Sequence, residues 1–142
     1  MDARVSRASL MLGLVLVAGG IVAISPAAVA KTIKVDDALM KTLDPDNDGT
    51  VSLAEAKAAG AAEFKKLNTE KDNTLDKKEL GSRVSKKDFK AADADNDGTL
   101  DEAEYGALVE KLFKAADPDN DGTLDKKELE SKNGQKLLQL IS

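Results

Sequence analysis

Four acidic twelve-residue segments recur along the chain with only twelve or thirteen residues between them. They span residues 44–55, 68–79, 93–104 and 117–128, so their starting positions are 24, 25 and 24 residues apart. A separator of that length holds one helix of about three turns, and the helix that leaves one segment must therefore also lead into the next. The spacing predicts an all-α, compact domain in which four loops share the helices between them.

Each segment places oxygen-bearing residues at positions 1, 3, 5, 7, 9 and 12, the seventh through its backbone carbonyl. In segment 44–55 these residues are Asp44, Asp46, Asp48, Thr50, Ser52 and Glu55. In segment 68–79 they are Asn68, Glu70, Asp72, Thr74, Asp76 and Glu79. In segment 93–104 they are Asp93, Asp95, Asp97, Thr99, Asp101 and Glu104. In segment 117–128 they are Asp117, Asp119, Asp121, Thr123, Asp125 and Glu128. This spacing resembles the EF-hand loop, in which hard cations take oxygen ligands from the same positions and the last Glu binds with both oxygens. All of these residues are therefore candidate metal ligands.

A single cluster of Asp, Asn and Gly would also suit a solvated turn. Four copies in register, each ending in Glu, favour metal loops instead. Segment 68–79 departs from the pattern, because Asn68 stands at position 1 and Asn73 replaces Gly at position 6. Asn adopts the left-handed conformation more readily than other non-Gly residues, so this segment is predicted to be the weakest of up to four sites.

Residues 1–30 have the pattern of a secretory signal peptide. Arg4 and Arg7 give a basic start, an apolar run covers residues 10–24, and small residues at 28–30 suit signal peptidase. Cleavage would leave an exported domain of residues 31–142, for which the periplasm is the expected compartment. An uncleaved N-terminal anchor is the alternative. The chain has no Cys, so disulfides and a lipoprotein anchor are excluded.

The predicted domain is strongly acidic. Without Arg4, Arg7 and Asp2 it keeps 19 basic and 25 acidic residues, a net charge of −6, and 18 of the 25 carboxylates occupy ligand positions. Because crowded like charges oppose a compact state, metal binding is expected to be coupled to ordering or compaction. The negative charge, with lysines spread between the loops, argues against nucleic-acid binding, and no membrane contact is expected after signal cleavage.

Apolar spacing predicts the helices between the loops. A helix is plausible over residues 53–67, with Gly60 as a weak point, and a clearer one covers residues 102–116. Between the second and third segments Gly81 and Ser82 are expected to break the helix, and Ser85 with Asp88 resembles a capping box. A last amphipathic piece, expected to close the core, holds Leu137, Leu138, Leu140 and Ile141.

The charge of the ligand sets bears on the identity of the cation. With Asp at position 9, the third and fourth segments each offer five carboxylates. Five carboxylates over-neutralise Ca²⁺, whereas a trivalent ion of similar radius is attracted half again as strongly by each ligand. This favours trivalent ions, although acidic EF-hand loops with Asp at position 9 also serve calcium.

The whole chain resembles the lanmodulin family of periplasmic lanthanide-binding proteins. The resemblance rests on the export signal, the close loop spacing, Pro45 and Pro118 at position 2, Asp at position 9, the stretch from Gly81 to Ser85 and the Leu-Ile ending. It implies selectivity for trivalent lanthanides, of the La³⁺ to Nd³⁺ type, over calcium. It also implies a metal-driven conformational change, and adjacent loops brought together around a helical core. Thr69, Ala94 and Ser52 depart from the family pattern.

The sequence therefore predicts an exported EF-hand protein that binds lanthanide ions for uptake, buffering or trafficking. The alternative is a periplasmic calcium buffer or calcium-stabilised interaction module. Metal ions are the expected partners, and another periplasmic metal-handling protein is a candidate to exchange them. An enzyme is not expected, because the chain has no His or Cys and its loop carboxylates are assigned to metal. The carboxylates outside the loops are expected to be solvated or to cap helices; they are Asp36, Asp37, Glu63, Asp88, Glu102, Glu110 and Glu130.

Overall fold

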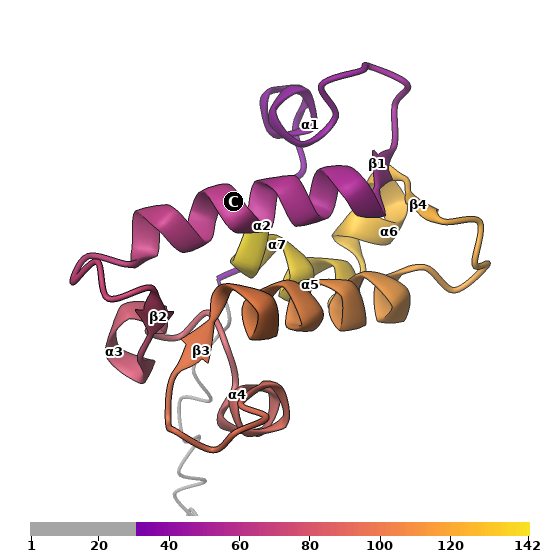
Figure 1. The fold of residues 1–142 in the computed structure, drawn as a ribbon. Helices are drawn as coiled ribbons and strands as arrows, with labels where there is room; N and C mark the ends of the chain where they lie inside the picture. The colour runs from indigo at the N-terminus through magenta and orange to yellow at the C-terminus, as the bar shows by residue number, and fades with distance from the viewer. Residues whose placement is uncertain (1–30) are drawn as a thin grey trace, which may run out of the picture.

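The computed structural model describes residues 31–142, and the expected signal peptide, residues 1–30, lies outside the described residues. As predicted, the described part is mostly helical (Figure 1). Its helices are α1 (Asp37–Leu43), α2 (Leu53–Leu67), α3 (Lys77–Leu80), α4 (Lys86–Ala92), α5 (Glu102–Ala116), α6 (Lys126–Glu130) and α7 (Lys132–Ile141). Its strands are β1 (Val51–Ser52), β2 (Thr74–Leu75), β3 (Leu100–Asp101) and β4 (Thr123–Leu124). Within residues 31–142, none of the helices has the length and apolar character that crossing a bilayer requires.

Loops 1 to 4, the segments that begin at Asp44, Asn68, Asp93 and Asp117, join in pairs at the two ends of the molecule. Strand β1 of loop 1 pairs antiparallel with β4 of loop 4, through Val51 and Leu124. Strand β2 of loop 2 pairs with β3 of loop 3, through Leu75 and Leu100. Figure 1 shows these pairs at opposite ends of α2 and α5.

The implied pairing of adjacent loops is correct for loops 2 and 3, and it is wrong for loops 1 and 2 and for loops 3 and 4. Helix α2 has 15 residues and is about 22 Å long at 1.5 Å per residue, so it holds loops 1 and 2 apart. Between loops 2 and 3 the helix ends at Gly81, whose φ is +55°, and the chain then reverses its direction. Loop 4 then meets loop 1 because α5 runs antiparallel to α2.

The core lies where α2, α5 and α7 pack together. The predicted helices over 53–67 and 102–116 are confirmed by α2 and α5. Gly60, expected to weaken α2, instead permits its close approach to α5, because a Cβ at this position would lie 3.0 Å from Val109 Cγ2. Helix α7 closes the core as expected, with Leu137, Leu138, Leu140 and Ile141 buried.

Two side chains from the loop 2 and loop 3 end secure the last turn of α7. Arg83 Nη1 donates to the carbonyls of Gln139 and Ser142, both at 2.9 Å. The buried Tyr105 hydroxyl donates to the carbonyl of Leu140 at 2.7 Å. Because the last carbonyls of a helix have no partner within the helix, these bonds tie α7 to the segments that flank loop 3.

Glu63 departs from its expected place on a solvated helix face. It is only 5% exposed, with Arg83 Nη2 at 3.2 Å from Oε1 and Lys66 Nζ at 2.8 Å from Oε2. Arg83 makes this burial tolerable, because a buried carboxylate needs an ionic partner. The pairing joins α2 to the turn between α3 and α4, a contact that local sequence patterns do not report.

Gly134 near the start of α7 offers a test of this packing. A Cβ there would collide with the backbone of Glu128 and Leu129, whereas a Cβ at Gly106 in α5 would meet nothing within 4 Å. Gly134→Ala should therefore destabilise the fold by roughly 1–3 kcal/mol through overpacking. Gly106→Ala should stabilise it by about 0.5–1 kcal/mol, as usual for helix interiors. Urea unfolding of both variants checks this, and two shifts of the same sign would contradict the packing of α7 on α6.

Candidate metal centre

Carboxylate oxygens converge in three of the four loops. Groups whose ligand oxygens all lie within 4.8 Å of one another occur in loops 1, 3 and 4 of the described chain. They consist of Asp44, Asp46 and Asp48; of Asp93, Asp95 and Glu104; and of Asp117, Asp119 and Glu128. Such triads of anionic oxygens suit a hard cation.

The first Asp of each triad is held by the bend of its own loop. Oδ2 of Asp44, Asp93 and Asp117 accepts the backbone N–H of the Gly five residues later, at 2.9, 3.2 and 3.1 Å. These glycines, at positions 49, 98 and 122, have φ of +88° to +90°, a conformation that Gly adopts without steric cost. In each of these loops the bend thus holds the side chain of the first candidate ligand in place.

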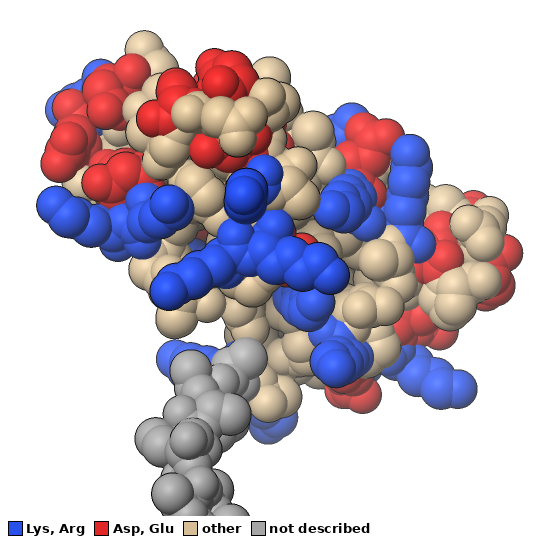
Figure 2. Space-filling model, turned by 90° about the horizontal axis from the view of Figure 1, so that it is seen from below, with Lys and Arg blue, Asp and Glu red and all other residues tan. Residues whose placement is uncertain are grey.

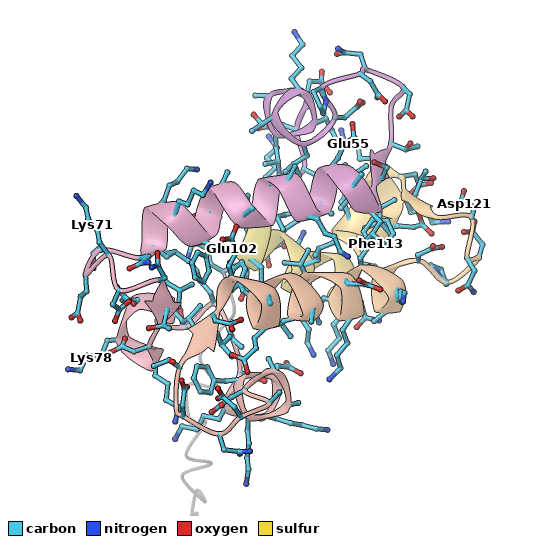
Figure 3. All side chains as sticks on the ribbon, in the orientation of Figure 1. Glu55, Lys71, Lys78, Glu102, Phe113 and Asp121 are labelled. Carbon is cyan, nitrogen blue, oxygen red and sulfur yellow. The ribbon has the colours of Figure 1, made fainter. Side chains whose placement is uncertain are left out.

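In loops 3 and 4 the first Asp of the triad has one carboxylate oxygen without a hydrogen-bond partner in the described chain. Oδ1 of Asp93 and Oδ1 of Asp117 are buried and have no hydrogen-bond partner within residues 31–142. Leaving a buried acceptor unpaired costs about 1–3 kcal/mol, which a coordinated cation would recover. The residues present therefore fit a metal ion in loops 3 and 4. In loop 1 the buried oxygen without a partner is instead Oε1 of Glu55, at the start of α2 (Figure 3).

Positions 9 and 12 of every loop also cap the helix that follows. Ser52, Asp76, Asp101 and Asp125 are the N-cap residues of α2, α3, α5 and α6. In each case the Glu three residues later accepts the N-cap backbone N–H, which completes a capping box. The ligand spacing alone does not predict this double role, although the S/D-x-x-E pattern in each loop signals it. Each Glu is thus both a capping residue and a candidate ligand.

The position-5 carboxylates face the backbone rather than the triads in loops 3 and 4. Oδ1 of Asp97 accepts the N–H and the hydroxyl of Thr99, at 2.8 and 2.7 Å. Asp121, on the outer rim of loop 4 (Figure 3), accepts the same two groups of Thr123 at 2.8 Å. The Thr99 bonds hold the pKa of Asp97 below its ordinary value.

Loop 2 lacks the convergence seen in the other loops. No triad of the described chain includes its residues, and Lys71 takes the left-handed conformation, with φ of +58°, where the other loops have Asn. Asn73 does adopt the left-handed conformation expected of it, with φ of +67°. Oδ1 of Asn68 is buried without a partner, so one ligand of a site is in place.

Neighbouring carboxylates contribute to the pKa shifts within the loops. In loop 1 the pKa of Asp46 is raised, mainly by its side-chain hydrogen bond with Asp44. In loop 4 the bond from the Asp125 N–H lowers the pKa of Glu128, but burial and the charges of Asp119, Asp125 and Asp117 outweigh it, so the net pKa lies above the ordinary value. A bound cation would relieve both effects.

The structure brings together nine of the candidate ligands, and the ligation of the complete set stays a prediction. Outside the triads lie Thr50, Ser52, Glu55, Asp97, Thr99, Asp101, Asp121, Thr123, Asp125 and the six residues of loop 2. The Thr residues at position 7 are predicted to bind through their backbone carbonyls, so they are not members of a carboxylate triad.

Replacing the last ligands of loops 3 and 4 should abolish the tightest binding. Because changes outside the ligand shell already cost about 10- to 100-fold in metal affinity, Glu104→Gln with Glu128→Gln should weaken it by more than about 100-fold. Gln still completes the capping boxes, so the helices should persist. Isothermal titration checks this. The control Glu102→Gln with Glu130→Gln removes the same charge from exposed positions, and retained affinity in the ligand variant would mean that the strong sites lie elsewhere.

Glu128 should make the metal-free protein less stable as the pH rises. Its folded pKa lies above the ordinary value of 4.5, so its stabilising contribution is present below that value and is lost as the pH passes through the folded pKa. Glu128→Gln and the parent protein should have about the same free energy of unfolding near pH 4. Toward pH 7 the variant should become the more stable protein, because Glu128 of the parent protein loses its proton between these two pH values. Urea unfolding in the presence of a metal chelator measures the free energy of unfolding of both proteins. A difference between them that does not vary with pH would exclude charge repulsion at Glu128.

Comparison with known proteins agrees with this geometry. Residues 87–109 and 108–131, which contain loops 3 and 4, match the EF hand family. A protein named lanmodulin, from Methylorubrum extorquens, is 56% identical over 74 residues, which are 52% of this chain and 53% of that protein. The chain thus spans about half the length of this relative. The acidic triads, the EF hand matches over loops 3 and 4 and the similarity to lanmodulin over about half of each chain agree in describing a lanmodulin-like chain with EF-hand loops.

Proposed function

We propose that the chain is an exported protein that binds trivalent lanthanide ions in preference to Ca²⁺ and becomes more compact on binding. The observation that carries this proposal is the convergence of acidic triads around buried carboxylate oxygens that have no other partner. The similarity to lanmodulin adds support. We assign the chain a binding role and no catalytic step.

Preference for a trivalent ion rests on charge. Loops 3 and 4 each hold five carboxylates at ligand positions. In loop 4 burial raises the pKa of Glu128, and repulsion by Asp119, Asp125 and Asp117 adds to the rise. A trivalent ion offsets more of this repulsion than a divalent ion of similar radius, because the attraction per ligand scales with the charge of the ion. Loops 3 and 4 are therefore proposed as the strongest sites, loop 1 as weaker and loop 2 as the weakest.

Compaction is proposed to follow from the same repulsion. The loop pairs lie at the two ends of the α2 and α5 pair, and each pair gathers carboxylates from two loops. Neutralising that charge favours the closed arrangement, in which β1 meets β4 and β2 meets β3. Export through an N-terminal signal peptide, periplasmic location, and a role in uptake, buffering or trafficking complete the proposal.

A calcium-binding role is the second candidate, and one observation favours it. Asp101 and Asp125, the residues that raise the carboxylate count to five, are committed to capping α5 and α6. If they keep that role when metal binds, each loop offers four carboxylates, a set that suits Ca²⁺. The protein would then be a periplasmic calcium buffer or a calcium-stabilised interaction module.

Circular dichroism of residues 31–142 distinguishes these functions. We expect helix content to rise with chelator-buffered La³⁺ at free concentrations many orders of magnitude below those of Ca²⁺ that give the same response. A variant with Glu55→Gln, Glu104→Gln and Glu128→Gln should lose the La³⁺ response, since each Glu closes one acidic loop. A full response at micromolar Ca²⁺, or equal sensitivity to both ions, would establish the calcium role instead.

A further inference from the structure

A groove beside loop 3 carries charge of the opposite sign to the metal loops. It has a volume of about 650 Å³, within the roughly 300–1,000 Å³ of pockets that hold small molecules. Its walls are Lys77 of α3, Lys86, Phe89 and Lys90 of α4, and Asp93, Asn96 and Gly98 of loop 3. The view from below α4 shows that Lys and Arg side chains gather on this face, with acidic groups on either side (Figure 2).

The three lysines of this groove have no acidic partner. Within residues 31–142, no carboxylate lies within 4.0 Å of Lys77, Lys86 or Lys90, although acidic residues outnumber basic ones there by 25 to 19. Lys77 Nζ lies 4.9 Å from the centre of the Phe89 ring, an attraction that holds the ammonium group over the groove. Three exposed ammonium groups around one concave surface are available to an anionic ligand from outside the chain.

The groove is also lined by a residue of the candidate metal site in loop 3. Asp93, which lines the groove, is 8% exposed and its Oδ1 has no partner in the described chain. It belongs to the triad with Asp95 and Glu104. The groove therefore combines ammonium groups with one residue of a candidate cation site. A ligand that carries both a cation and excess negative charge complements both.

We propose that this groove docks a small polycarboxylate chelate of the metal ion and hands the ion to loop 3. Lys77, Lys86 and Lys90 bind the free carboxylates of the chelator. The metal–oxygen bonds of the chelator are then replaced by bonds to Asp93, Asp95 and Glu104, and the chelator leaves as an anion, with no change in oxidation state. This inference rests on the proposed metal-binding function.

The cavities beside the other two triads show why the inference is specific to loop 3. The cavity beside loop 4 is lined by a single lysine, Lys127, and the cavity beside loop 1 by a single lysine, Lys66. They therefore offer less attraction to an anionic chelate. Three lysines at the end of loop 4 and the start of α7, at positions 126, 127 and 132, are also exposed and provide a matched control.

Stopped-flow Tb³⁺ luminescence tests the handover. Energy transfer from Tyr105, the only Tyr in a chain without Trp, reports protein-bound Tb³⁺, because this residue directly follows Glu104. Tb³⁺ is supplied either as its citrate complex or as the hydrated ion. The variants are Lys77→Gln, Lys86→Gln and Lys90→Gln together, and the control Lys126→Gln, Lys127→Gln and Lys132→Gln, which has the same net charge.

We expect the groove variant to take Tb³⁺ from citrate about tenfold more slowly than the parent chain, the lower end of electrostatic steering effects. Its capture of the hydrated ion should be unchanged or faster, since less positive charge repels the cation. Equal slowing in both variants would show an effect of net charge only, and no slowing would exclude the groove as a docking site. Failure of the parent chain to capture Tb³⁺ from either source would overturn metal binding itself, and the groove with it.

Discussion

The shared helices between closely spaced loops determine the rest of the structure. Because only twelve or thirteen residues separate successive loops, α2 must both leave loop 1 and lead into loop 2, and α5 does the same for loops 3 and 4. Each is a rigid spacer about 22 Å long, so the loops it joins cannot meet. The chain can reverse its direction between loops 2 and 3 only because the helix ends at Gly81. The antiparallel α2 and α5 then bring loop 1 to loop 4 and loop 2 to loop 3, and α7 covers the seam between them.

The same carboxylates serve the helices and the candidate metal sites. In each loop the residue at position 9 caps the following helix and the Glu at position 12 completes the capping box. The start of every such helix therefore depends on groups that a metal ion would also engage. Cation binding at Glu104 would act directly on the first turn of α5, where Tyr105 holds the end of α7. Metal binding and helix packing are linked by adjacent residues.

Local patterns predicted the elements that depend on local interactions. The bounds of α2 and α5 could be predicted from the helical spacing of apolar residues between the loops, and the caps at Ser52 and Asp101 agree with them. Long-range contacts left no such signal. Examples are the buried pairing of Glu63 with Arg83 and the two bonds between the Gln135 amide and the backbone of Ile33, at 2.6 and 2.8 Å. At the sites, ligand types followed from spacing, but the choice of carboxylates that converge did not. Asp48 in loop 1 and Asp97 in loop 3 accept the same two bonds from the Thr two residues later, yet only Asp48 belongs to a triad.

The loops that pair with each other also share features of sequence. Loops 1 and 4 share the same first seven residues, DPDNDGT, and they are partners through β1 and β4. Loops 2 and 3 both lack the proline and are partners through β2 and β3. Loop 2, with Asn68 and Lys71, is thus joined to a loop that has a complete acidic triad. An ion that orders loop 3 would also fix Leu100 and, across the bridge, Leu75, so the loop with the poorest ligands is ordered by its neighbour rather than by its own bend.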